Sequence, residues 1–335
     1  MRIVMMGTGT FAEPTFEALL GAFGSGVVGL VTQPERDAGS KRGSTRQTGK
    51  GMANIARAAS VPVVQPESIN TPDGVELLRA MQPDLLAVAA YGQILSKDVL
   101  AVPARGVINV HASLLPKYRG AAPVAYAILS GDAQTGVTII KVTPGLDSGD
   151  MILQEALGIL PTDTTGSLEA RLAEVGSRLA VEAAHKYAAG GPIEGVKQDP
   201  ALVTRAPKIK KEFGLIDWTK PAAEIERHVR AMQPWPTAYT FFHRPAYLDQ
   251  PAKETMRIIV SRVEPFGKNP LPGRACGTPY GYTPEPGRLL VLAGDNDFVS
   301  ILELQPAGKK KMTAAEFLRG YPLEGVQRFG PEVLA

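Results

Sequence analysis

The 335-residue sequence contains a single cysteine, Cys276. One cysteine excludes an intramolecular disulfide and any zinc site built from several cysteines, and it is typical of a reducing compartment. The sequence also lacks a run of about 18 apolar residues, the length that a membrane-spanning helix needs. Its first residues, MRIVMMGTGT, enter a strand and a glycine turn without the features of a signal peptide. We therefore expect a cytoplasmic protein with no membrane partner.

Neither sign of charge is in large excess, with 36 basic and 33 acidic side chains and a formal net charge of +3. Any affinity for a polyanion must then come from local clusters of cations and not from the total charge. Hydrophobic residues make up 44% and charged residues 21% of the chain, as in ordinary globular proteins. A chain of this length is long enough for two domains.

Short apolar runs, several of them rich in β-branched residues, alternate with helix-length segments in the first half of the chain. The runs are RIVMM, GVVGLVT, VPVV, DLLAVAA, GVINV and GVTIIKV. This alternation predicts an α/β domain with a parallel sheet covered by helices on both faces. Because parallel strands end at one edge, we expect Gly7–Thr10, Tyr91–Ile94 and Asn109–Ser113 to gather there.

The turn GTGTFA after the first run fits a loose dinucleotide-binding pattern. That pattern needs an acidic residue about 20 positions later, at the end of the second strand. The sequence has Thr32, Gln33 and Pro34 there. We interpret the glycines as a tight turn into a helix and expect no nicotinamide cofactor.

A change in pattern divides the chain in two. A long helical segment, EARLAEVGSRLAVEAAHKYAAGG, ends in two glycines and is followed by an irregular stretch. We predict a first domain at residues 1–190, a linker at 191–206 and a second domain at 207–335. Short strands near AYTFF, MRIIVSRV, RLLVLAG and FVSILEL predict a small antiparallel barrel in the second domain, and Thr313 with Glu316 predicts the start of a final helix.

The chain places an Asn, a His and an Asp where three polar groups are useful together. Asn109 and His111 lie two apart on one strand and so share a face. Asp147 lies in the turn PGLDSGD, which follows GVTIIKV and is therefore expected at the same sheet edge. We expect its carboxylate to fix the tautomer of His111. Asp150 is interpreted as a residue that bonds to its local backbone.

No nucleophilic serine or cysteine accompanies these residues. Ser113 is the nearest hydroxyl, but no G-x-S-x-G turn surrounds it. The set therefore favours direct acyl transfer to an external amine. Asn109 would donate to the developing oxyanion, His111 would stabilise it or move protons, and Asp147 would orient the imidazole and help take the amine proton.

The stretches NVHASLLPKYRGAAPV and GLDSGD, together with TQPER, AYGQIL and DWTKPAAEIERHVRAMQPWPTAY, resemble the folate-dependent formyltransferases over most of the chain. The resemblance implies a Rossmann-like formyltransferase domain and a smaller, C-terminal barrel similar to an OB fold. It also implies transfer of the formyl group of 10-formyltetrahydrofolate to the amino group of methionine on initiator tRNA, without a metal. No obligate protein partner is expected.

The same resemblance assigns roles to individual residues. Asn109, His111 and Asp147 match the catalytic trio of the family. The residues that match the folate-contacting stretch are Ser113, Leu114, Leu115 and Pro116, although simple packing at a strand exit also explains them. At the neighbouring strand end, a second stretch would complete an apolar slot for a flat pteridine. Its residues are Tyr91, Gly92, Gln93 and Ile94.

Basic clusters mark candidate tRNA contacts. The glycine-rich loop Gln33–Gly51 carries Arg36, Lys41, Arg42, Arg46 and Lys50. A second cluster at the domain junction carries Lys208, Lys210 and Lys211, and a third lies at AGKKKM. Solvated surface cations are the alternative interpretation of each.

Two other functions remain open at this stage. One is formyl transfer to a nucleotide-linked amine, such as glycinamide ribonucleotide or an amino sugar, because those relatives share the same trio. Ala112, the YRGAAP stretch, the basic loop and the second domain favour tRNA. The other is a non-catalytic RNA-binding protein, which the intact trio argues against.

Overall fold

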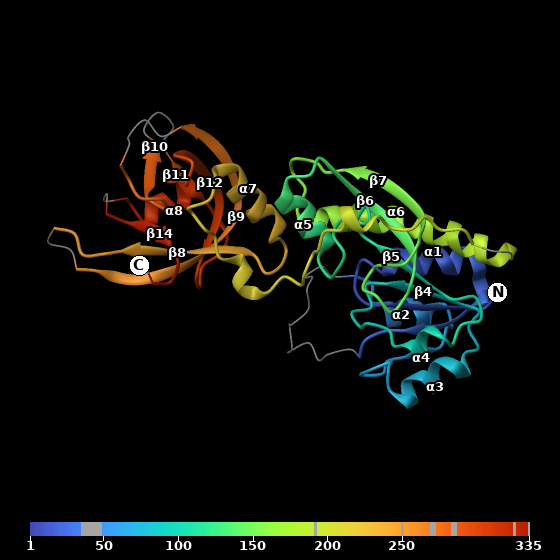
Figure 1. Ribbon diagram of the computed structural model, residues 1–335. Coiled ribbons are helices and arrows are strands. Elements are labelled where there is room, and N and C mark those ends of the chain that lie inside the picture. Colours follow the sequence, from blue (N-terminus) through green and yellow to red (C-terminus); the bar gives the residue numbers. More distant parts are fainter. Residues whose placement is uncertain are drawn as a thin grey trace. The chain divides into compact units, whose positions relative to one another are not determined.

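The computed structural model describes residues 1–34, 49–190, 193–248, 251–268, 273–282, 287–323 and 326–333. The chain forms two compact units (Figure 1). The first consists of residues 1–127 and 132–208, and the second of residues 128–131 and 209–335. Residues 193–206, expected to be a linker, thus belong to the first unit. Within the described ranges, none of the helices combines the length and apolarity that a membrane crossing requires.

A seven-stranded sheet forms the centre of the first unit. Its strands in spatial order are β3 (Val63–Val64), β2 (Val27–Val31), β1 (Ile3–Gly7), β4 (Leu85–Ala89), β5 (Val107–His111), β6 (Gln134–Lys141) and β7 (Met151–Gly158). The strands from β3 to β5 are parallel to one another. All five residues of β1 and of β4 are buried, so helices cover this part of the sheet on both faces, as the sequence predicts.

The direction of β6 differs from the prediction. β6 is antiparallel to β5, with Ile108 opposite Lys141 and His111 opposite Thr138. An apolar run predicts a strand but carries no information about its direction. The turn that holds Asp147 therefore begins beside the start of β5 and not at its carboxyl end. Residues 142–150 run back to reach His111 and then lead into β7.

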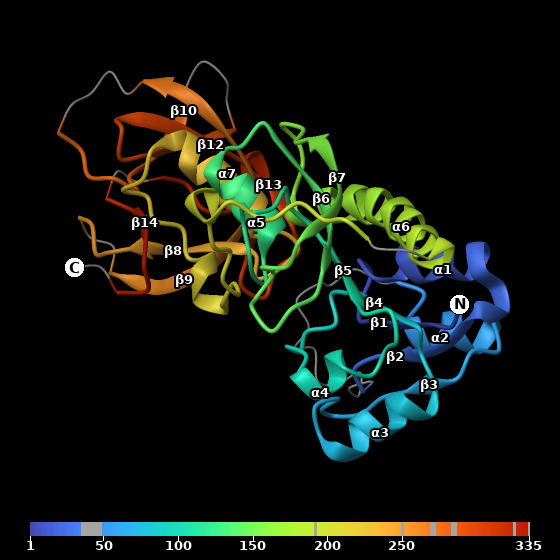
Figure 2. The ribbon, with the colours of Figure 1, turned by 45° about the vertical axis from the view of Figure 1, so that its right-hand side comes forward.

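The helices of the first unit are α1 (Glu13–Phe23), α2 (Met52–Ala58), α3 (Pro72–Ala80), α4 (Lys97–Leu100), α6 (Thr165–Ala189) and the first five residues of α5 (Pro123–Ser130). Figures 1 and 2 show α1 and α6 side by side along one face of the sheet, with α3 and α4 on the other. Gly176 lets α6 approach β5 closely, because a Cβ there would lie 2.7 Å from a methyl group of Val110. Helix α6 thus packs directly against the strand that carries Asn109 and His111.

In its described residues, the second unit is an antiparallel sheet with two α-helices and a short 3-10 helix at Lys211–Gly214. Its elements are α7 (Ala222–Ala231), β8 (Ala238–Arg244), β9 (Lys253–Lys268), β10 (Pro279–Tyr282), β11 (Arg288–Leu292), β12 (Asp297–Pro306), β13 (Met312–Thr313), α8 (Ala314–Gly320) and β14 (Arg328–Gly330). The strand order is β10-β11-β12-β9-β8-β14, and β13 pairs with β12. The four strands predicted here are confirmed as β8, β9, β11 and β12, and the Thr313–Glu316 capping box is present.

Gly277 joins the two ends of this curled sheet. Its N–H donates to the carbonyl of Leu292 on β11, and its carbonyl accepts from the N–H of Phe329 on β14, both at 2.8 Å. Inside the curl, Phe242, Phe317 and Phe329 are fully buried and their rings pack together. The closed, aromatic-filled sheet corresponds to the OB-like barrel that the sequence predicts.

Candidate active site

A cavity of about 660 Å³ opens at the edge of the first sheet where β1, β4 and β5 end. These strands are parallel neighbours, so the loops that follow them meet at this edge. The cavity is lined by residues 8–11 after β1, residues 90–95 after β4 and residues 109–112 at the end of β5. Loop residues 142–147 close another side. The three segments expected to gather from the sequence thus all contribute to one cavity.

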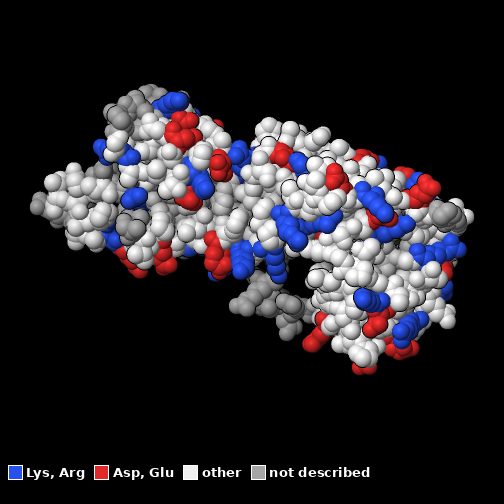
Figure 3. Space-filling view, viewed as in Figure 1, with Lys and Arg blue, Asp and Glu red and all other residues white. Residues whose placement is uncertain are grey.

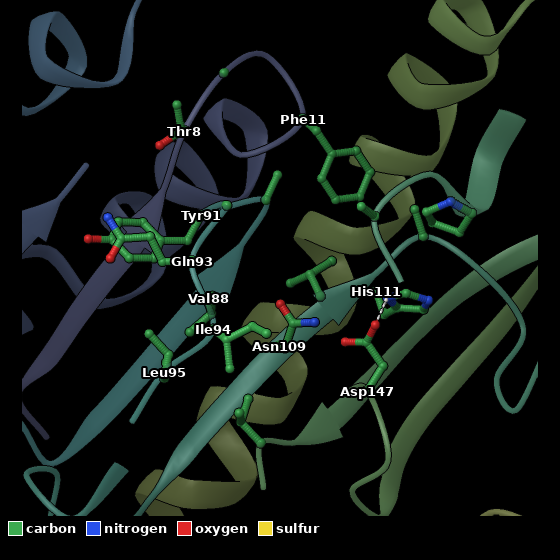
Figure 4. Close-up of a pocket in the computed structure, with 18 of the residues that line it drawn as sticks. Thr8, Phe11, Val88, Tyr91, Gln93, Ile94, Leu95, Asn109, His111 and Asp147 are labelled. Atoms are coloured by element: carbon green, nitrogen blue, oxygen red, sulfur yellow. Dashed lines mark ion pairs between the residues drawn. The ribbon is translucent and has the colours of Figure 1, made fainter. Parts of the chain in front are cut away.

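His111, the last residue of β5, is buried, with 5% of its surface exposed. Its Nε2 lies 3.0 Å from the main-chain carbonyl oxygen of Tyr118. A carbonyl can only accept, so Nε2 carries the proton, and Nδ1 is the acceptor of the neutral ring. Nδ1 lies 3.7 Å from Oδ2 of Asp147 (Figure 4). The tautomer is therefore fixed by the Tyr118 carbonyl and not, as the sequence suggested, by Asp147.

Asp147 reaches His111 from the loop between β6 and β7. Its φ of +46° lies in the left-handed region, which is unfavourable for a residue with a Cβ. Its Oδ2 accepts a hydrogen bond of 2.8 Å from the main-chain N–H of Gly120. This bond holds the carboxylate beside the imidazole, where a proton taken from a substrate can be shared between two acceptors.

Burial lowers the pKa of His111 below its ordinary value, because the charged imidazolium loses its hydration. The nearby Asp147 carboxylate and the hydrogen bond to Tyr118 act in the opposite direction, and the Arg119 charge lowers the pKa further. Burial is the largest of these effects. His111 is thus neutral at physiological pH, with an Nδ1 lone pair ready to accept a proton.

Asn109 lies on the same face of β5 as His111, and its amide points into the cavity in Figure 4. Among the described residues, none forms a hydrogen bond with this side-chain amide. Its NH₂ group is therefore available to a substrate oxygen. An amide donor held on a rigid strand beside a proton acceptor is the arrangement that stabilises an oxyanion formed at a carbonyl carbon.

Two carboxylates that no sequence motif indicated also line the cavity. Glu13, at the start of α1, accepts hydrogen bonds from the main-chain N–H groups of Lys50 and Gly51 at 3.0 and 2.9 Å. Glu169, on α6, lies in the wall, and burial raises its pKa to about 7. Neither position has a motif around it, so an ordinary helix surface was the natural expectation.

The segment after β4 forms a second wall of the cavity. Ile94, which is 71% exposed, and Leu146, which is 47% exposed, both lie at the rim of the cavity. The hydroxyl of Tyr91 is buried, and no described residue hydrogen-bonds to it. Gln93 is held at both ends of its amide, by the N–H of Ile69 and the carbonyl of Glu67. The wall is therefore a firm, largely apolar surface beside Gly92.

The stretch Ser113 to Pro116 lies outside the lining of this cavity. Ser113 is fully buried, and its hydroxyl donates to the carbonyl of Lys117 at 2.6 Å. The N–H of Leu115 donates to the hydroxyl of Thr138, and Leu114 packs over Gly136. The structure thus favours the packing interpretation of these four residues.

The predicted tRNA contacts fall into three groups. Arg36, Lys41, Arg42 and Arg46 lie outside the described residues. Lys50 is described and forms an ion pair of 2.6 Å with Glu17. Lys208, Lys210 and Lys211 are exposed. On the face shown in Figure 3, basic and acidic side chains are interspersed over both units, in keeping with the small net charge.

Family models and known proteins match this chain over most of its length. Residues 1–184 match the family model of formyl transferases, and residues 208–322 match the C-terminal domain of formyl transferases. A methionyl-tRNA formyltransferase of Chloroflexus aggregans is 42% identical over 96% of this chain and 97% of its own length. One from Acidithiobacillus ferrooxidans is 44% identical, with 96% of each chain covered.

Solved structures share the fold at lower identity. A sugar 3N-formyl transferase, crystallised in the presence of dTDP and 5-N-formyl-THF, superposes with a TM-score of 0.64 at 16% identity, covering 92% of this chain and 99% of its own. An N-formyltransferase from Helicobacter canadensis gives the same score and identity over 90% and 98%. The whole-length relatives and both family models establish that this chain belongs to the formyltransferase family, in the branch of the methionyl-tRNA formyltransferases.

Proposed function

We propose that this protein transfers the formyl group of 10-formyltetrahydrofolate to the amino group of methionine carried by initiator tRNA. The observation that carries the proposal is the meeting of Asn109, His111 and Asp147 at one cavity. An unpaired amide donor there lies beside two proton acceptors, Nδ1 and Oδ2, which are 3.7 Å apart. Relatives named methionyl-tRNA formyltransferase match this chain over nearly its whole length.

The cavity suits a folate donor. A pteridine and its attached ring are flat, with faces that suit apolar contact and polar groups along the pteridine edge, and the rim offers the exposed side chains of Ile94 and Leu146. The turn at Gly92 supplies main-chain polar groups within the same wall. A solved protein of the same fold was crystallised with a related formyl-folate. We assign the donor to the wall formed by residues 91–95.

The chemistry follows from the three side chains. The amine nitrogen attacks the formyl carbon, and the carbonyl oxygen becomes an oxyanion that accepts a hydrogen bond from the Asn109 amide. The attacking nitrogen loses a proton to the neutral Nδ1 of His111, and the Asp147 carboxylate stabilises the imidazolium that results. Cleavage of the bond to the folate nitrogen then returns this proton to the leaving group.

The α-amino group of an amino acid whose carboxyl group is esterified to tRNA is a suitable nucleophile. An ordinary α-amino group titrates near pH 7.7–8.0, and an adjacent ester lowers this pKa further. A neutral nucleophile is therefore present at physiological pH. The site needs to accept one proton as the new bond forms, which a neutral imidazole can do.

Other acceptors receive less support. Amino-sugar enzymes share only the fold with this chain, at 16% identity. The relatives that match this chain at 42–44% identity over 96% of its length are methionyl-tRNA formyltransferases, which supports the tRNA acceptor over a small nucleotide. A non-catalytic RNA-binding role does not explain why the three groups retain a reactive geometry. Action on charged tRNA would place the protein in the cytoplasm.

A direct assay separates these acceptors. The protein is incubated with labelled 10-formyltetrahydrofolate and either methionyl initiator tRNA, glycinamide ribonucleotide or an amino sugar nucleotide. We expect label only in the methionyl-tRNA. Label in either small acceptor, with none in tRNA, would contradict the proposed substrate.

The role of Asp147 has its own test. Asp147→Asn keeps an oxygen that can accept from the Gly120 N–H but removes the charge beside His111. We expect kcat to fall by about 10²–10³, the usual loss when a transition-state charge loses its partner. Single-turnover transfer to methionyl-tRNA measures this. A variant that retains full kcat would refute the assignment.

A further inference from the structure

Residues 196–206, which follow α6 and precede the second unit, are bound to both loops that contact His111. Val196 and Met151 exchange two main-chain hydrogen bonds of 2.9 and 2.8 Å, beside the loop that holds Asp147. Further along, the carbonyl of Thr204 accepts from the N–H of Arg119 at 2.9 Å, in the loop that contains Tyr118. This segment is therefore part of the structure around the imidazole and not a free connection.

Gln198 lies in this segment, and its side chain is fully bonded. Its NH₂ group donates to the main-chain carbonyls of Asp147 at 2.7 Å and Gly149 at 2.8 Å. Its oxygen accepts from Nε and Nη2 of Arg119 at 2.9 and 2.7 Å. A glutamine amide has two donor hydrogens and two acceptor lone pairs, so all four are used.

Arg119 also determines which way the Gln198 amide faces. A guanidinium can only donate, so the amide oxygen must point toward Arg119 and the NH₂ group toward the Asp147 loop. In the opposite orientation donors would face donors at one end, and the amide oxygen would face two carbonyls at the other. The pair therefore presents two N–H groups at a fixed place.

The loop that receives these hydrogen bonds adopts a conformation that its sequence does not favour. Asp147 has a φ of +46°, which costs on the order of 1 kcal/mol for a residue other than glycine. Gly149 is packed so tightly that a Cβ would overlap the carbonyl of Lys141. Hydrogen bonds to the carbonyls of residues 147 and 149 hold both ends of this short turn and aim the Asp147 carboxylate at His111.

We propose that Gln198, oriented by Arg119, is a positioning residue that holds the Asp147 carboxylate against His111. The inference rests on the proposed function, because it gives a role to a residue that does not touch the substrate. Gln198 acts on the main chain of Asp147, and Gly120 completes the arrangement by donating to its side chain. Loss of Gln198 leaves Asp147 in the cavity but lets its carboxylate move.

The test uses the full chain with two substitutions at residue 198. Gln198→Glu keeps an acceptor for Arg119 and removes both donors to the loop. Gln198→Met removes all four hydrogen bonds without adding a charge. We expect both to lower kcat by about 10- to 100-fold and to change the KM for folate and for tRNA less than threefold. In an Asp147→Asn background we expect the same substitutions to cost less than threefold, because the group they position is already lost.

Gln154→Glu is the matched control. Gln154 lies on β7 in the same unit, and its amide also donates two hydrogen bonds, to the carbonyl of Leu115 and the hydroxyl of Thr138. Leu115 belongs to the loop after β5, but Gln154 makes no hydrogen bond to Tyr118, Gly120 or the loop that holds Asp147. We expect a comparable change in thermal stability with kcat retained. An equal loss of kcat in this control would overturn the proposal. So would double variants at residues 198 and 147 whose loss of kcat equals the product of the two single losses.

A second readout does not depend on activity. The Asp147 carboxylate raises the pKa of His111, so its displacement should lower that pKa. We expect the NMR titration midpoint of His111 to fall in Gln198→Met, in the same direction as we expect for Asp147→Asn. An unchanged midpoint would refute the positioning role. A wild-type protein that transfers no formyl group to methionyl-tRNA would instead refute the proposed function.

Discussion

His111 is held neutral by its surroundings, and this determines how the site depends on pH. Burial places the pKa of His111 below 6.5, so the folded protein binds fewer protons there than the unfolded chain as the pH falls. Stability from this residue is therefore present above pH 6.5 and is lost as the pH falls through the lowered pKa. The same protonation blocks the Nδ1 lone pair, so transfer and stability should decline together on the acid side.

Glu169 has the opposite effect and gives a testable prediction. Burial raises its pKa to about 7, so ionisation is unfavourable in the folded protein. The unfolded carboxyl ionises near pH 4.5, and stability is then lost as the pH rises toward and through 7. Glu169→Gln removes this cost. We expect the variant to match the wild type at pH 5 and to be more stable by about 1–2 kcal/mol at pH 8.

Urea unfolding at a series of pH values measures the difference. Glu174→Gln, on the exposed side of the same helix, is the matched control. A stability difference for Glu169→Gln that stays constant between pH 5 and pH 8 would show that burial does not raise the pKa of the Glu169 carboxyl group.

At the level of single residues, the sequence predicted three side chains that meet at one cavity but not the groups that hold them in place. Asn109, His111 and Asp147 were found because side-chain chemistry and local spacing point to them. The Tyr118 carbonyl was missed because a main-chain acceptor has no residue-type signature. Gln198 was missed because its contact spans 51 positions and lies in a stretch with no periodic pattern.

At the level of elements, the closure of the second unit depends on one glycine. Gly277 has a φ of +83°, and a Cβ there would overlap the carbonyl oxygen of Phe329. We expect Gly277→Ala to separate β14 from β11 and to lower the free energy of unfolding by about 3–4 kcal/mol. This sums a left-handed alanine at about 1–2 kcal/mol and two hydrogen bonds at about 1 kcal/mol each.

Tryptophan fluorescence can follow this unit alone. The two tryptophans of the chain, Trp218 and Trp235, both lie within residues 209–335. Gly308→Ala is the control, because Gly308 has a φ of +72° but open space around its Cα. It should cost only the conformational penalty. Equal losses in the two variants would mean that the contact with Phe329 does not hold the sheet closed.

The sequence predicted which elements exist better than how they run. Apolar periodicity located β1, β2, β4, β5 and the main strands of the second unit. It gave β6 the wrong direction, and it did not mark β7, whose residues alternate between half-buried and exposed. The residues of β7 are positioned by pairing with β6. Such pairing is a tertiary property that a local pattern does not contain.

At the level of the whole molecule, the charge is nearly balanced, so contact with a tRNA must depend on local cations. Lys208, Lys210 and Lys211 occur where the chain passes from the first unit to the second. Their side chains are exposed, and none forms an ion pair with an acidic side chain among the described residues. Exposed cations without partners are available to phosphates and release counterions on contact.

Neutralising this cluster tests its role on the full chain. We expect the triple substitution of Lys208, Lys210 and Lys211 by Gln to reduce the salt dependence of tRNA binding, log Kd against log salt, by roughly 2–3, about one for each phosphate contact. The KM for tRNA should rise about tenfold or more near 0.15 M salt, with the KM for folate unchanged. A control with Lys97, Lys186 and Lys220 replaced by Gln removes the same charge at scattered, exposed sites. If both triples change the slope equally, the effect is one of total charge, and the three junction lysines make no specific contact with the tRNA.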